Sequence, residues 1–346
     1  MSSLHRAAGS APAAPEAGLE LILARGGEGL SARMRLTERH LQEVTASAGA
    51  PLASLALETV MAGGKRLRPL LVVLAAESAG GPPDTGDGEI RLVRAAVAVE
   101  LVHSATLVHD DVIDGASLRR GRPTVAVRAG RRAAISTGDL LFSRAFAELA
   151  RNEDVAQLRA LSDASSALAE GELLQREDAY AVGVTLERYL RRCELKTAAL
   201  FEAACRLGAL SALRSSCALA DALAAFARRI GLAFQMLDDV LDVSGPPERT
   251  GKPRGMDLLD GTVTLPFILA RESDPRLAGV DLRALRGAGQ AQELCERIAA
   301  TGALEQARTQ ALAVVEEAKA ALPDVLASGR ATLLNLVADA VVERYR

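Results

Sequence analysis

The chain has 346 residues, of which 49% are hydrophobic, and it carries a formal net charge of −3. This length and hydrophobic content are sufficient for one large domain or two ordinary ones, and the near-neutral charge indicates neither a general nucleic-acid binder nor an acidic tail protein. Aromatic residues make up only 3% and tryptophan is absent, so the core must consist of Leu, Ala and Val. Because Ala and Leu favour helices, whereas aromatic and β-branched residues favour strands, this composition argues against a sheet-rich fold.

Residues 1–18 are rich in Ala, Pro, Gly and Ser, which predicts a disordered N-terminal tail. Within 19–346 apolar residues recur at spacings of three and four, which predicts a single all-α domain of about ten or more helices. The segment 91–114 carries apolar residues around most of its circumference and is predicted to be a buried central helix. Further amphipathic helices are predicted within 134–150, 162–177, 186–210 and 222–243.

The cysteines lie at Cys193, Cys205, Cys217 and Cys295, and none forms a CxxC pair. On a continuous helix the first three would lie about 18 Å apart, too far for a shared metal or a disulfide. We therefore expect reduced, buried thiols in a cytoplasmic protein. The N-terminus lacks the apolar segment of a signal peptide, and no uncharged apolar run of about 18 residues predicts a transmembrane segment.

Two aspartate clusters, DDVID and DDVLD, each stand at the end of a long apolar helix. They comprise Asp110, Asp111 and Asp114 in the first, and Asp238, Asp239 and Asp242 in the second. On a helix, aspartates four residues apart share a face at about 6 Å and repel each other, while the intervening neighbour points about 100° away. If the clusters face each other across a bundle, their all-oxygen donor set favours magnesium, completed by substrate phosphates. The alternative is two solvated helix ends.

Cations that could bind an anionic substrate occur close to these clusters and in a glycine-containing segment, GGKRLRP. They are Lys65, Arg66, Arg68, Arg119, Arg120, Lys196 and Lys252. Arginine forks suit bidentate binding of phosphate, whereas lysine acts as a point charge. Taken singly, each could be an ordinary surface charge, but together they predict two diphosphate pockets, one bridged by metal and one formed by cations alone.

The motifs resemble those of the trans-isoprenyl diphosphate synthases, the polyprenyl synthetase family. They occur in the family's order, as GGKRLRP, HSATLVHDDVIDGASLRRGRPT, GELLQ, LKTA, FQMLDDVLD, GKPRGMDL and TLP. The resemblance extends from about residue 20 to the C-terminus. It implies an all-α isoprenoid-synthase helical bundle, usually dimeric, around a central substrate cavity. It also implies magnesium at the cavity mouth, about three ions bound together with an allylic diphosphate.

Position by position, the resemblance implies roles for individual residues. Asp110, Asp114 and Asp238 resemble the magnesium ligands, with Asp111, Asp239 and Asp242 in support. The residues that match the isopentenyl diphosphate site are Lys65, Arg68, His103 and Arg120. The residues that match the allylic diphosphate site are Arg119, Lys196, Thr197, Gln235 and Lys252; Thr197 and Gln235 correspond to oxygens near the developing carbocation. One position departs from the family, because many relatives carry a lysine just before TLP, whereas this chain has Thr262 and Val263 in GTVTLP.

Product length in this family depends on the depth of the cavity. Ala105 and Thr106 lie one helical turn before Asp110, where short-chain members carry bulky aromatic residues, and Phe142 and Phe146 are candidates for a lower floor. The small residues imply a long product of about six to ten isoprene units, as in a quinone side chain. Ordinary close packing of helices is the alternative explanation for them.

The resemblance thus implies a magnesium-dependent trans-prenyltransferase that repeatedly condenses isopentenyl diphosphate with an allylic diphosphate. Alternatives are a synthase of geranylgeranyl or farnesyl length, or a class I terpene cyclase, although cyclases differ in the second cluster. A homodimer is expected, but the chain could also be a catalytic subunit that needs a small partner; a non-catalytic subunit would usually lack the aspartates. RGRP at 121–124 resembles a DNA minor-groove hook, but it occurs once, beside three aspartates, so no nucleic-acid partner is predicted.

Overall fold

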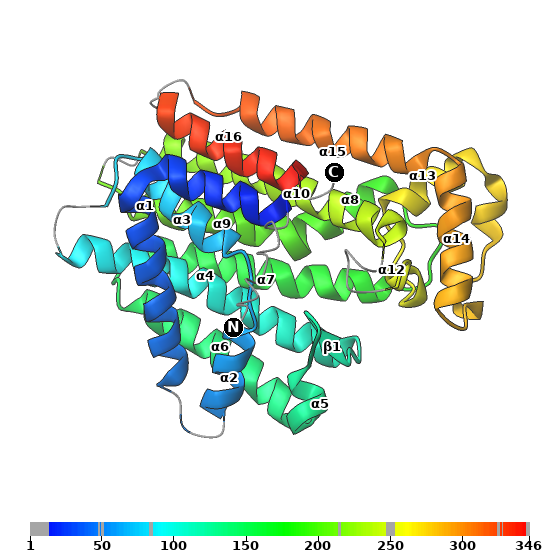
Figure 1. The fold of residues 1–346 in the computed structure, drawn as a ribbon, viewed down its shortest axis with the longest axis horizontal. Coiled ribbons are helices and arrows are strands. Elements are labelled where there is room, and N and C mark those ends of the chain that lie inside the picture. The colour runs from blue at the N-terminus through cyan, green and yellow to red at the C-terminus, as the bar shows by residue number, and fades with distance from the viewer. Residues whose placement is uncertain are drawn as a thin grey trace, which may run out of the picture.

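The computed structural model describes residues 14–47, 49, 52–82, 86–213, 216–246, 253–323, 326 and 328–343. In this part of the chain helices dominate, and the strands are two residues each, β1 (Leu118–Arg119) and β2 (Arg122–Pro123), paired in an antiparallel hairpin. The prediction of an all-α fold is confirmed (Figure 1).

The helices follow one another along the chain and are connected by short loops. In the N-terminal half they are α1 (Ala14–Ala46), α2 (Leu52–Met61), α3 (Leu67–Ser78), α4 (Gly86–Ile113), α5 (Val125–Ala129), α6 (Arg131–Ala150) and α7 (Val155–Glu177). After these come α8 (Leu186–Cys193), the π-helical turn η1 (Glu194–Ala198), α9 (Ala199–Leu210), α10 (Cys217–Ser244), α12 (Met256–Leu259) and α13 (Leu265–Ser273). The C-terminal part contains two 3₁₀ turns, η2 (Pro275–Gly279) and η3 (Leu282–Ala284), and then α14 (Ala288–Ala300), α15 (Ala303–Ala320) and α16 (Ser328–Glu343).

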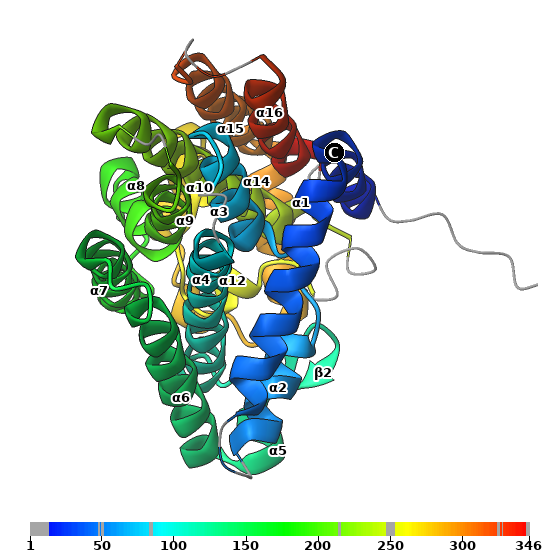
Figure 2. The same cartoon turned by 90° about the vertical axis from the view of Figure 1, so that its left-hand side faces the viewer.

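Helix α4 runs through the middle of the molecule, between α1, α3, α6 and α9 (Figure 2). It contains the predicted central segment, and its buried residues include an almost unbroken run from Ala95 to Val102. By length and composition α4 could cross a membrane, but 72% of its apolar window is buried inside the protein. Its apolar character is therefore that of a core helix, as the sequence predicted.

Helix α10 is the second long central helix and packs against α9, η1 and α15. Ser216 caps its start, since the serine side chain accepts a hydrogen bond from the backbone N–H of Leu219. Two glycines allow the helices around it to approach closely. A Cβ at Gly231 would lie 2.8 Å from the Cα of Ala198, and one at Gly208 would lie 2.0 Å from the carbonyl oxygen of Val72. These contacts fix how α9 lies between α3 and α10.

Two details differ from the expectations. Helix α1 begins at Ala14, within the segment predicted to be a disordered tail, and Gly18 lies against Ala340 of α16; residues 1–13 lie outside the described residues. Packing against α16 therefore stabilises helix where composition alone predicted none. All four cysteines are free thiols, but Cys217 is exposed at the start of α10 rather than buried.

Candidate active site

The two aspartate clusters contribute to the wall of one cavity of about 490 Å³. Asp110 lies in the last turn of α4 and Asp114 directly follows this helix, whereas Asp238 and Asp239 lie in the last two turns of α10. We call this space the acidic cavity. Other polar residues that line it are Arg119, Gln175, Arg176, Arg192, Lys196, Thr197, Gln235, Asp257, Asp260, Thr262 and Thr264.

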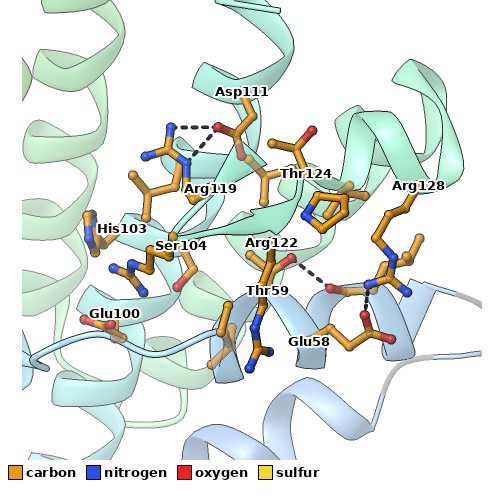
Figure 3. A pocket seen from close by; sticks show the side chains of 18 of the residues that line it. Glu58, Thr59, Glu100, His103, Ser104, Asp111, Arg119, Arg122, Thr124 and Arg128 are labelled. Carbon is orange, nitrogen blue, oxygen red and sulfur yellow. Dashed lines mark hydrogen bonds and ion pairs between the residues drawn. The ribbon is translucent and has the colours of Figure 1, made fainter. Parts of the chain in front are cut away.

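The remaining two aspartates of the clusters have supporting contacts. The Asp111 carboxylate accepts a hydrogen bond of 2.7 Å from Arg119 Nε, and the same oxygen forms an ion pair with Arg119 Nη2 at 2.7 Å (Figure 3). These contacts fix the β1–β2 hairpin to the end of α4. The Asp242 carboxylate accepts a hydrogen bond from the backbone N–H of Asp257 at 3.2 Å. The backbone carbonyl oxygen of Asp242 accepts another from the backbone N–H of Gly255. Asp242 thus anchors the start of α12 to α10.

Two carboxyl groups of the acidic cavity, those of Asp110 and Asp239, are poorly solvated. Burial raises the pKa of Asp110 to about 6, with Glu172 and Asp114 adding to the rise while Lys196 and Arg119 oppose it. Burial, together with the charge of Asp257, raises the pKa of Asp239 to about 8. The physical cause is the gathering of several carboxylates away from water, an arrangement that bound cations would stabilise.

The residues fit a magnesium site that is completed by substrate. Among the described residues no group of three or more His, Cys, Asp or Glu side chains lies close enough to hold a metal ion alone. Asp114 is paired with Arg176 at 2.9 Å. The donors are nevertheless carboxylates on two helices that border one space, and magnesium characteristically takes one or two carboxylates, several waters and substrate phosphates. An open, all-oxygen site of this kind suits that coordination.

A hydrogen-bonded chain connects η1 to the second aspartate cluster. Thr197 Oγ1 donates to Gln235 Oε1, Gln235 Nε2 donates to Asp239 Oδ1, and the Tyr189 hydroxyl donates to Asp239 Oδ2, each at 2.7 Å. The neighbouring Lys196 ammonium bonds to Glu172 and, at 3.2 Å, to Gln175 of α7. These contacts hold the side chains of Lys196 and Thr197 at the wall of the cavity.

The backbone at Lys196 departs from a regular α-helix. Glu194–Ala198 forms a π-helical turn between α8 and α9, a feature that changes the hydrogen-bond register and is frequent at functional sites. Gly171 on α7 lies against this turn, where a Cβ would be 2.6 Å from the backbone nitrogen of Lys196. Only glycine allows α7 to lie so close, which explains the glycine of GELLQ.

A second cavity of about 580 Å³ lies beside the acidic cavity and is rich in basic groups. We call it the cationic pocket; it is lined by Leu19, Glu20, Gly64, Lys65, Arg66, Leu67, Arg68, Glu100, His103, Arg120, Phe201 and Phe234. Arg68, His103 and Phe234 line both spaces. The two cavities therefore share a wall.

Within the cationic pocket Arg68 and His103 are strongly affected by burial. Burial lowers the pKa of Arg68 to about 10, and its Nε has no hydrogen-bond partner among the described residues. Its guanidinium lies 4.6 Å from the centre of the Phe201 ring. Burial and the surrounding arginines hold the pKa of His103 well below its ordinary value, so its imidazole is neutral. An anion would relieve the desolvation of Arg68.

Arg66 has a structural role in this pocket. Its guanidinium pairs with Glu38 at 2.9 Å and with the buried Glu100 at 2.8 Å. Its backbone has a left-handed φ of 48°, and Arg120 and Tyr180, which also border the two cavities, have φ values of 52° and 65°. Such conformations are costly for residues other than glycine and are characteristic of functional sites.

Residues 50–300 match the model of the family described as polyprenyl synthetase. The chain belongs to the polyprenyl synthetase family.

Known members of this polyprenyl synthetase family resemble the chain over most of its length. Heptaprenyl diphosphate synthase component 2 of Geobacillus stearothermophilus is 40% identical over 82% of this chain and 84% of its own. Geranylgeranyl diphosphate synthase of Methanosarcina mazei is 39% identical over 82% of this chain and 87% of its own. The crystal structure of a polyprenyl synthase from Caulobacter crescentus CB15, complexed with calcium and isoprenyl diphosphate, is 34% identical, with a TM-score of 0.86 over 99% of this chain and 100% of that one. The chain is therefore a prenyltransferase with the all-α fold of that family.

Four residues singled out from the sequence have surroundings that differ from the simple expectation or lie outside the described residues. Arg119, expected on the allylic diphosphate, lines the acidic cavity but is bonded to Asp111. Lys252 lies outside the described residues. Thr262 lines the acidic cavity, whereas Val263 is fully buried.

The four residues predicted to set product length lie on two helices, Ala105 and Thr106 on α4 and Phe142 and Phe146 on α6. Thr106 lines the acidic cavity. Ala105 is fully buried, and Phe142 of α6 stacks on His109, which shares a helix face with Ala105. Phe142 and Phe146 are partly buried against the core. Of these four residues, only Thr106 lines the acidic cavity.

Other site residues of the polyprenyl synthetase were not singled out from the sequence. Glu172 and Gln175 stand within the quoted GELLQ motif, whose spacing carried the signal for them. Tyr189, Arg176 and Arg192 had no local signal, because a tyrosine or arginine in an amphipathic helix is usually a surface residue. Their place in the site follows from long-range contacts.

Proposed function

We propose that this prenyltransferase condenses isopentenyl diphosphate with an allylic diphosphate in a magnesium-dependent reaction. It repeats the condensation to give an all-trans product of about six to ten isoprene units, because the residue that lines the cavity one turn before Asp110 is the small Thr106 and not a bulky aromatic residue. The observation that carries the proposal is the shared wall of two unlike cavities, one lined by aspartates and one by a group of lysine and arginine side chains. The acidic cavity suits a diphosphate ester that binds together with metal ions, and the cationic pocket suits a diphosphate ester that binds without them.

In the acidic cavity, Asp110, Asp114 and Asp238 would hold magnesium. When bound, magnesium supplies neutralisation of the charge that develops on the diphosphate as its carbon–oxygen bond breaks. Lys196 and Arg119 bind the same diphosphate from the side of η1 and of the hairpin. The oxygens of Thr197 and Gln235, which are hydrogen-bonded to each other at the cavity wall, would stabilise the cation that remains on the allylic carbon.

In the cationic pocket, Lys65, Arg68 and Arg120 bind the diphosphate of isopentenyl diphosphate, and neutral His103 donates an N–H to it. Bound in this way, isopentenyl diphosphate would have its double bond directed toward the allylic carbon, on the side where the two cavities adjoin. The isopentenyl double bond attacks the allylic cation left when the carbon–oxygen bond breaks, and a carbon–carbon bond forms. The released diphosphate then accepts the proton lost from the adjacent carbon, and the electron pair of that C–H bond forms the new double bond. No separate histidine or carboxylate base is then required.

Purified protein with magnesium, isopentenyl diphosphate and allylic primers of several lengths is expected to yield long-chain prenyl diphosphates, sized by chromatography. Chelation of magnesium should stop incorporation, and its restoration should recover it. Products of geranylgeranyl or farnesyl length would contradict the long-chain proposal. Cyclic hydrocarbons formed without consumption of isopentenyl diphosphate would instead identify a terpene cyclase.

The substitution Arg68→Gln tests whether the two diphosphates bind at separate sites. We expect this variant to raise the KM for isopentenyl diphosphate by about 10- to 100-fold, the worth of a lost charge-assisted hydrogen bond, because Arg68 is a half-buried cation of the cationic pocket. The KM for the allylic primer should change little. Arg159→Gln, at an exposed position of α7 that lines neither of the two cavities, is the matched control. An equal rise in both KM values would contradict the separate assignment.

Assembly and location remain predictions from the family resemblance. We propose a homodimer in the cytoplasm. The name of the Geobacillus relative, component 2, supports testing a small second subunit as well. Sedimentation of the purified chain, together with its activity in isolation, distinguishes these states: a homodimer active alone would contradict the need for a second subunit.

A further inference from the structure

Arg192 is a buried cation that the assignments above leave without a role. It stands in the last turn of α8, is only 3% exposed and lines the acidic cavity. Its Nη2 donates a hydrogen bond of 2.6 Å to the carbonyl oxygen of Val263. Its Nη1 is buried with no hydrogen-bond partner among the described residues, and the carboxylate oxygen that it approaches, Oδ2 of Asp178, is 3.9 Å away.

The other acidic-cavity cations near the aspartates are differently engaged. Arg119, Arg176 and Lys196 are each hydrogen-bonded to a carboxylate. Arg192 has its hydrogen bond to a neutral backbone carbonyl, and its ion pair with Oδ2 of Asp178 is too long, at 3.9 Å, for a hydrogen bond. The other oxygen of Asp178, Oδ1, is bonded to Arg188. A buried guanidinium donor without a partner is destabilising by about 1–3 kcal/mol. An anionic ligand in the cavity would remove that cost.

The hydrogen bond between Arg192 and Val263 places the guanidinium of Arg192 beside one particular segment of the cavity wall. Val263 follows Thr262, and Thr262 lines the acidic cavity at the position of GTVTLP where the resemblance led us to expect a lysine. The guanidinium, docked on this segment, therefore brings a positive charge from α8 to the wall that lacks the lysine. Because residues 192 and 262 are far apart in the chain, the sequence alone does not indicate that Arg192 could replace the missing lysine.

We propose that Arg192 is a diphosphate-binding residue that replaces the missing lysine, its Nη1 donating to the allylic diphosphate. The proposal rests on the proposed function, since it assigns a contact to the same allylic site. Thr262, in this view, is tolerated only because an arginine reaches the segment from another helix.

Arg192→Gln, Thr262→Lys and the double variant test this assignment. Calorimetric titration with inorganic diphosphate in the presence of magnesium measures binding without turnover, and initial rates give KM for each substrate. We expect Arg192→Gln to weaken diphosphate binding and raise the allylic KM by at least about tenfold, the worth of a charge-assisted hydrogen bond. Adding Thr262→Lys should recover most of the loss, a coupling that the double-mutant cycle quantifies.

Thermal unfolding of each variant separates binding from structure. Arg192→Lys, which keeps the charge, should retain diphosphate binding within about threefold even if loss of the Val263 contact lowers the Tm. Arg191→Gln removes the neighbouring exposed charge and is the matched control. If Thr262→Lys leaves the diphosphate affinity of Arg192→Gln unchanged, or if Arg192→Gln raises both KM values equally, the assignment is overturned.

The two proposals can fail separately. A wild-type protein that does not consume isopentenyl diphosphate would refute the proposed function, whereas diphosphate titration still measures the contribution of Arg192. An active wild type whose diphosphate affinity is unaffected by Arg192→Gln would refute the role of Arg192 alone.

Discussion

Asp110→Asn is expected to lower kcat by on the order of 10³-fold or more while leaving the protein folded. The substitution keeps the shape of the side chain but removes a carboxylate that would hold magnesium, and metal neutralisation of a leaving diphosphate is worth several kcal/mol in the barrier. Because Asp110 is half-buried among other acidic groups, removal of its charge also relieves repulsion within the native state. The Tm should therefore be unchanged or higher.

Single-turnover rates and thermal unfolding measured on the same preparation check this expectation. Asp163→Asn, an exposed aspartate on the outer surface of α7, is the matched control and should keep wild-type turnover. An Asp110→Asn variant with more than about a tenth of wild-type kcat would show that this carboxylate contributes less than about 1.4 kcal/mol to the barrier. The metal assignment for the first cluster would then be wrong.

Thr106→Phe is expected to shift the product distribution to much shorter chains. Thr106 lines the acidic cavity one helical turn before Asp110, and its hydroxyl donates a hydrogen bond of 2.8 Å to the carbonyl oxygen of His103 in the same helix. A phenylalanine there projects an aromatic ring into the space that a growing chain must enter. Chromatographic sizing of products from one primer measures the effect, and Thr106→Val should keep the wild-type product length.

Ala105→Tyr is also expected to shorten the product, but with a loss of stability. Ala105 is fully buried, so the tyrosine must displace neighbouring core atoms before it narrows the cavity. Overpacking of this kind costs about 1–3 kcal/mol. If neither variant alters product length, the cavity below the first aspartate cluster does not set it.

Local sequence patterns carried the helical prediction and much of the site. Apolar spacing predicted the long helices because helix formation depends on residues within a few turns of one another. The spacing in DDVID and DDVLD likewise placed each set of aspartates on adjacent helix faces. The short motifs around Lys65, Lys196 and Gln235 drew attention to residues that line the two cavities.

Which face of a helix is turned to which neighbour could not be predicted in this way. Asp239 lines the cavity, whereas Asp242 anchors α12, although both belong to one motif. Ala105 and Thr106 are adjacent in the chain and differ in surroundings. The difference depends on packing with α6 and on the walls of the cavity, which are set by contacts far apart in the sequence.

By itself the sequence determined the helical class, the position of the acidic ends of two long helices and the supply of cations around them, because helix periodicity and charge are local properties. The tertiary structure alone decided that a cationic pocket shares a wall with the acidic cavity, and that Arg192 lies against the segment of Thr262. Both depend on helices distant in sequence being packed together, and burial then changes the energies of the charged groups they carry.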